Sequence, residues 1–162
     1  MMEELEEPGW ITPEVMQDLR SQVAERILAK ELPLVTPAEG ITLLAALRDG
    51  GLLTEQRYLD FAVMLVSREA SEVAAGGDYL AAAAVIDDAI VLFGTDGRFN
   101  AARTGYRYNY AVEVHNAFAA LFNKGEYAAA SELLKAAIEK VPESAILHND
   151  MKAVEKTLSR SE

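Results

Sequence analysis

The chain has 162 residues, of which 51% are hydrophobic and none is cysteine, and its 15 basic and 26 acidic side chains give a net charge of −11. This length can bury one sizeable core, while the negative charge disfavours binding to a nucleic-acid backbone or an anionic membrane surface. The lack of cysteine excludes disulfides and thiolate metal sites and fits a reducing compartment.

Residues 1–9 are acidic and interrupted by Pro8, which predicts a frayed N-terminus that Trp10 can anchor. Residues 10–53 predict a pair of helices, because Thr12-Pro13 and Thr36-Pro37 are both typical helix starts. The apolar residues of the first helix, which runs to about residue 30, share one face: Val15, Leu19, Val23 and Ile27. The second helix is shorter and stops at Gly50-Gly51.

Four further helices are predicted, and the first two have clear start signals. Thr54 caps a long helix that ends at Gly76-Gly77, and Asp78 opens the next, which runs to about Phe93. Two more form a helical hairpin turned at Gly125, between residues 114 and 142. The segment 95–108 fits either a loop or an early helix start near residue 100.

Ser144 then caps a last helix, over residues 144–159, whose outer side is polar as expected of a capping helix. All five prolines lie within the first 37 residues or at Pro142, so long uninterrupted helices are allowed between them. We therefore expect an all-α chain of about seven helices forming a single compact domain.

The two glycine turns belong to an internal repeat. Setting Gly77 beside Gly125 aligns residues 63–94 with residues 111–142 without gaps, for example Ala82 with Ala130 and Ile86 with Leu134. The pattern resembles the tetratricopeptide repeat family. Residues 111–142 match it well. Residues 63–94 match less well, because Glu69 replaces an apolar residue and Gly94 replaces the terminal proline.

The spacing of 48 residues between the turns (125 − 77) exceeds the family period of about 34, so we interpret residues 95–108 as an insert. The resemblance implies a right-handed superhelix of helical hairpins over residues 54–162. The alternative is an ordinary helical bundle with similar hairpins.

The resemblance also implies a concave groove, lined by the first helix of each pair, that holds a peptide or a partner's helix. Asn116 stands where members of the family often bind the peptide backbone, although an exposed or locally bonded side chain is the alternative. The other expected groove residues are His115, Ala119, Phe122, Asn123, Ser67, Arg68 and Ser71. The lysine and asparagine pattern that binds chaperone tails is absent.

A second candidate surface lies in the insert, where arginine and tyrosine alternate in an otherwise acidic chain. These residue types are frequent at interface hot spots and suit an acidic partner. The residues are Arg103, Tyr106, Arg107 and Tyr108. The alternative is structural, with tyrosines packed against the core and arginines neutralising nearby carboxylates.

We expect no catalytic site, metal site or cofactor. The chain has two histidines, His115 and His148, and neither has a second ligand at helical spacing. No phosphate-binding loop, dinucleotide fingerprint or nucleophile elbow occurs. With no signal segment and no apolar run of about 18 residues in this sequence, a cytoplasmic location without membrane insertion is expected; the alternative is a longer parent protein that is exported or anchored.

The predicted function is therefore a protein-interaction adaptor that binds a protein or peptide. Self-association into a homodimer, through the N-terminal helices or the insert, is the alternative. A small-molecule site between the N-terminal helices and the repeats is a third possibility.

Overall fold

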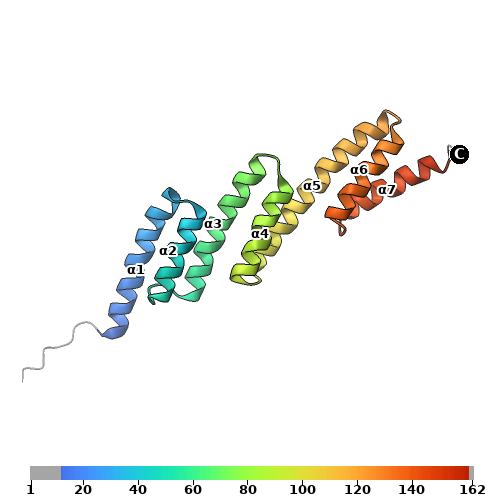
Figure 1. Cartoon of the computed structure of the whole chain (residues 1–162). Coiled ribbons are helices and arrows are strands. Elements are labelled where there is room, and N and C mark those ends of the chain that lie inside the picture. The colour runs from blue at the N-terminus through green and yellow to red at the C-terminus, as the bar shows by residue number, and fades with distance from the viewer. Residues whose placement is uncertain (1–11, 161–162) are drawn as a thin grey trace, which may run out of the picture. The chain divides into compact units, whose positions relative to one another are not determined.

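The computed structural model describes residues 12–160, which form seven α-helices, one short 3-10 helix and no strand (Figure 1). The elements are α1 (Pro13–Glu31), η1 (Leu32–Leu34), α2 (Pro37–Asp49), α3 (Glu55–Ala75), α4 (Tyr79–Phe93), α5 (Gly97–Asn123), α6 (Tyr127–Lys140) and α7 (Ala145–Leu158). The predicted all-α class and its seven helices are confirmed. The predictions for residues 1–9 and Trp10 fall outside the described residues.

Most helix starts follow from side-chain caps. The Thr12 hydroxyl accepts a hydrogen bond from the Val15 amide at 3.3 Å, and Asp78 accepts one from the Ala81 amide at 2.9 Å. Glu126 precedes α6, as predicted, but its side chain makes no cap hydrogen bond. The longer glutamate side chain is a poorer N-cap than serine, threonine, aspartate or asparagine.

Both predicted hairpin glycines occupy the left-handed region of the backbone. Gly77 lies between α3 and α4 with φ 87°, and Gly125 lies between α5 and α6 with φ 78°. Glycine adopts this conformation without the steric cost that a Cβ atom imposes. The two glycines therefore end α3 and α5 at the predicted positions.

The chain divides into two compact units, one ending at Arg68 and one beginning at Glu69. The first unit contains α1, η1, α2 and the N-terminal part of α3. Its core includes four fully buried leucines: Leu28, Leu32, Leu44 and Leu65. A Cβ atom on Gly40 of α2 would lie 2.6 Å from a Leu65 methyl carbon, so any larger residue there would displace the buried Leu65 side chain of α3.

The second unit is organised by the 27-residue helix α5. The segment left open between loop and helix is helical, because α5 begins at Gly97, where Asp96 accepts a hydrogen bond from the Arg98 amide at 2.7 Å. At this end of α5 the Phe99 ring stacks on Phe93 of α4 with centroids 6.2 Å apart. Residues 97–108 therefore extend the first helix of the hairpin, and only residues 95 and 96 of the open segment lie outside it.

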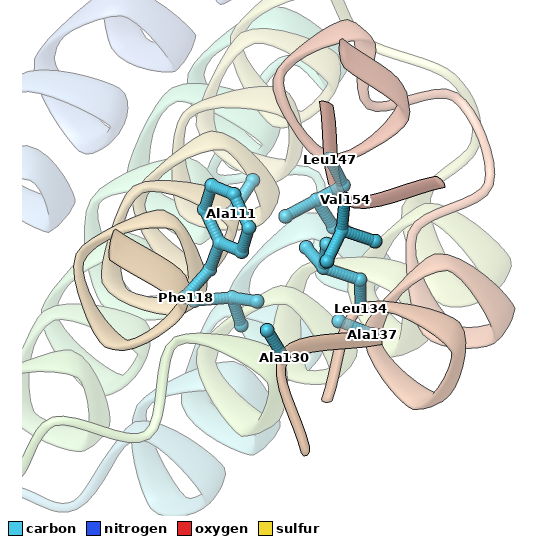
Figure 2. Packing of buried hydrophobic residues seen from close by; sticks show 8 residues of the cluster. Ala111, Phe118, Ala130, Leu134, Ala137, Leu147 and Val154 are labelled. Atoms are coloured by element: carbon cyan, nitrogen blue, oxygen red, sulfur yellow. The ribbon is translucent and has the colours of Figure 1, made fainter. Parts of the chain in front are cut away.

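The C-terminal half of α5 packs against α6 and α7. Figure 2 shows the buried cluster, to which all three helices contribute. Its members are Ala111, Val114, Phe118, Ala130, Leu134, Ala137, Leu147 and Val154. Alanines alternate with larger residues, so the helices can approach closely while the leucine and phenylalanine side chains fill the space between them. The right-handed superhelix of repeats stays a prediction.

Candidate functional site

Helix α5 has one buried face and one exposed, polar face. Ala111, Val114 and Phe118 point into the cluster, whereas three asparagines, Asn109, Asn116 and Asn123, are exposed. They are seven residues apart, and seven residues are almost two helical turns, so they form one row along the helix. None of their side chains hydrogen-bonds to another described residue. We call these three residues the asparagine row.

The predicted groove residues beside this row have different environments. The His115 ring nitrogen Nδ1 lies 2.8 Å from Oδ2 of the buried Asp150, which links α5 to α7. The Phe122 ring lies 5.1 Å from the ring of Tyr127 across the hairpin, and Ala119 is half-buried. His115 and Phe122 therefore take part in the packing of the second unit.

The predicted residues on α3 are divided between the two units. Arg68 belongs to the first unit and donates hydrogen bonds to the Leu32 carbonyl at 2.9 Å and the Val35 carbonyl at 2.6 Å. Its guanidinium thus satisfies two backbone carbonyl groups at η1 and just after it. Ser67 is half-buried in the same unit. Ser71, in the second unit, has its hydroxyl 3.3 Å from that of Tyr106.

The arginines of the second candidate surface are paired with carboxylates. Arg103 bonds to Asp87 of α4 at 3.1 Å, and Arg107 bonds to Glu143, after α6, with an Nε–Oε1 distance of 2.5 Å. Hydrogen bonding from Arg107 lowers the pKa of Glu143 and raises that of Arg107. Tyr108 is 59% exposed and lines a cavity of about 210 Å³ together with Arg107 and Glu143. Both arginine side chains are thus paired with carboxylates of the second unit.

In the first unit, the predicted apolar face of α1 is exposed. Val15, Leu19, Val23 and Ile27 are between 44% and 56% exposed, while the buried residues of α1 are Ala24 and Leu28. We call the four exposed residues the α1 row. A cavity of about 410 Å³ adjoins it, lined by Met16, Leu19, Arg20, Val23, Ala24, Ile27, Leu47 and Leu52. Its lining is almost entirely apolar, so it suits apolar side chains of another segment.

The described residues contain no group of three or more histidine, cysteine, aspartate or glutamate side chains placed to hold a metal ion. Every buried side-chain polar atom among them has a hydrogen-bond partner. No helix within residues 12–160 is both long enough and apolar enough to cross a membrane.

Comparison with family models, curated proteins and solved structures gives no match. The site must therefore be argued from its own residues. Sequence reasoning found Asn116 and Asn123 but missed Asn109, because the predicted helix began after Asn109 and was not extended backwards into the unassigned segment. The spacing of seven residues between asparagines was the available signal.

Proposed function

We propose that the chain is a non-enzymatic protein-interaction module that binds an extended peptide segment of a partner protein along the exposed face of α5. The observation that supports this most is the asparagine row, three exposed primary amides on one helix face with no hydrogen bond to other described residues. The resemblance of residues 111–142 to tetratricopeptide repeats supports it independently, because an asparagine at the place of Asn116 often binds peptide backbone in that family.

The chemistry of the row suits a peptide backbone. Each asparagine amide offers both an N–H donor and a carbonyl acceptor, the same pair of groups that every non-proline peptide unit presents. Seven residues of α-helix rise about 10.5 Å, which is close to the length of three residues of extended chain. Successive asparagines can therefore bond to the same peptide at intervals of about three residues.

The surroundings of the asparagine row suit peptide binding. Glu113 and Ala120 share the exposed face with the row, and neither side chain covers the asparagine amides, since Ala120 ends at its Cβ atom. Because the row lies on a helix whose opposite face is buried in the cluster, the amides are presented on a rigid element. Backbone recognition of this kind tolerates many side chains, so sequence preference must come from the residues around the row.

A displayed library of random linear peptides, selected on the full chain, tests the proposal. The affinity of selected peptides would be measured by fluorescence anisotropy for the wild type and for the triple variant Asn109→Ala, Asn116→Ala and Asn123→Ala. With about 1 kcal/mol for each hydrogen bond, the three substitutions should weaken binding by about 100-fold.

The matched control is Asn149→Ala on α7, which removes an exposed amide from another helix and should leave affinity unchanged. Circular dichroism would confirm that both variants keep the helical content of the wild type. Peptides that bind the triple variant as tightly as the wild type would exclude the face of α5 as the binding surface.

A further inference from the structure

A small cavity of the second unit adjoins the asparagine row. Its volume is about 210 Å³, and it lies between the N-terminal half of α5 and the start of α7. Tyr108, Arg107, Ala145 and Ile146 are among the residues that line it, and we call it the Tyr108 pocket. Because Tyr108 directly precedes Asn109, the pocket is level with one end of the row.

Arg107 fixes the shape of the Tyr108 pocket. It donates hydrogen bonds to the Glu143 carboxylate, with an Nε–Oε1 distance of 2.5 Å, and to the Lys140 carbonyl at 3.1 Å. These bonds tie α5 to the connection between α6 and α7, so the walls of the pocket are held in place before a ligand binds. The Arg107 side chain is 26% exposed and that of Glu143 is 59% exposed, so the more accessible charge of the pair is the carboxylate. An acidic side chain is therefore disfavoured as the occupant.

Two further polar side chains of the pocket are also hydrogen-bonded within the second unit. The Thr104 hydroxyl donates to the Asn100 carbonyl at 2.8 Å, and the Ser144 hydroxyl accepts from the Leu147 amide at 3.5 Å. The apolar surface of the pocket comes from four residues: Tyr108, Val141, Ala145 and Ile146. The pocket therefore suits an apolar side chain, which needs no hydrogen-bond partner.

The size and place of the pocket match one large apolar side chain of a peptide on the row. An apolar cavity of about 150 Å³ holds a benzene molecule. The Tyr108 pocket, at about 210 Å³, therefore has room for a leucine, isoleucine, methionine or phenylalanine side chain. Adjacent residues of an α-helix project about 100° apart, so the pocket flanks the row at Asn109. From Asn109 to Asn123 the row rises about 21 Å, which is the length of about six residues of extended chain.

We propose that the Tyr108 pocket anchors a large apolar side chain at one end of the peptide segment bound along the asparagine row. This inference rests on the function proposed above and supplies the sequence preference that backbone recognition lacks. Alternate side chains of an extended peptide point to opposite sides, so one of two adjacent residues near Asn109 can direct its side chain into the pocket. The partner is thus a protein with an extended segment that carries leucine or a similar apolar residue at one end.

The peptides selected on the full chain provide the first test. They should share leucine, isoleucine, methionine or phenylalanine, and no acidic residue, at one end of the bound segment. Replacing that residue by alanine should weaken binding to the wild type by about tenfold, measured by fluorescence anisotropy. In nuclear magnetic resonance spectra, the methyl protons of a leucine at this position should show nuclear Overhauser contacts with those of Ile146.

Variants of the chain locate the effect. In Tyr108→Ala, which removes a wall of the pocket, and in Ala145→Phe, which fills it, the leucine and alanine peptides should differ less than about threefold in affinity. The matched control is Ala136→Phe on α6, at an exposed alanine that does not line the pocket, and it should keep the tenfold difference. Circular dichroism would confirm that all three variants keep the helical content of the wild type.

The outcomes separate this inference from the proposed function. Peptides that require the three asparagines but show the same tenfold difference in every variant, or no difference in the wild type, would overturn the pocket and leave the row as the binding surface. Peptides whose leucine depends on the pocket but whose affinity survives the triple asparagine substitution would keep the pocket and exclude the row. A selection that yields no binding peptide would overturn both.

Discussion

Truncating Leu134 tests whether α5, α6 and α7 form one packed unit. The Leu134 side chain is fully buried and belongs to the cluster in Figure 2. Leu134→Ala removes three carbon atoms, which at about 0.8 kcal/mol each corresponds to about 2.4 kcal/mol of lost burial. The remaining cavity adds to this, so we expect the free energy of unfolding to fall by about 3 kcal/mol, within the range of about 2.7 to 5 kcal/mol known for such substitutions.

The assay is urea unfolding of the full chain followed by circular dichroism. With a slope of about 2 kcal/mol per molar urea, the midpoint should fall by about 1.5 M. Lys135→Ala is the matched control, because the neighbouring side chain is exposed and makes only a surface pair with Glu132 at 2.8 Å. A loss below about 1 kcal/mol for Leu134→Ala would refute the packing of the three helices around this residue.

Two further predictions concern the second unit. Gly105→Ala, inside α5 where an added Cβ meets no atom within 4 Å, should raise the free energy of unfolding by about 0.5 to 1 kcal/mol, whereas Gly125→Ala should lower it by about 1 to 2 kcal/mol because φ is 78° there. Thermal unfolding measures both changes. If Gly125→Ala raised the free energy of unfolding as Gly105→Ala does, the turn at Gly125 would not be left-handed. The lowered pKa of Glu143 means that its pairing with Arg107 stabilises the fold above a pH of about 4.5 and that this stability is lost as the pH falls through the lowered pKa. Glu143→Gln should therefore lower the free energy of unfolding at neutral pH by a small amount, since the carboxylate is exposed. The variant should also lose less stability than the wild type on acidification. An identical dependence of unfolding free energy on pH in the two proteins would contradict the pairing.

The sequence predicted the helix starts well because they depend on local chemistry. A hydroxyl or carboxylate at the N-cap binds backbone amides two or three residues ahead, as Thr12, Thr36 and Asp78 all do. The glycine turns are equally local. The start of α5 was harder, because Gly94, Asp96 and Gly97 read as a turn and the segment after them has mixed polarity. Its helical state is stabilised by contacts with α4, such as Phe99 on Phe93, that no local pattern contains.

The candidate site was predictable only in part for the same reason. Asn116 was recognised by its distance from Gly125, but Asn109 joins the asparagine row only when residues 97–123 form one helix. The pairing of His115 with Asp150 joins residues 35 positions apart in the sequence, and that of Arg107 with Glu143 joins residues 36 apart. Pairings between residues so far apart in the sequence depend on the fold. Sequence spacing does not show them, and we therefore predicted that these side chains lie on open surfaces.

The α1 row shows what hydrophobic periodicity can and cannot decide. Apolar residues at a spacing of four predict that Val15, Leu19, Val23 and Ile27 share a face, and they do. Periodicity does not say which side of the helix the rest of the unit covers. In α1 the smaller Ala24 and the single Leu28 face the core, which leaves the larger apolar face exposed.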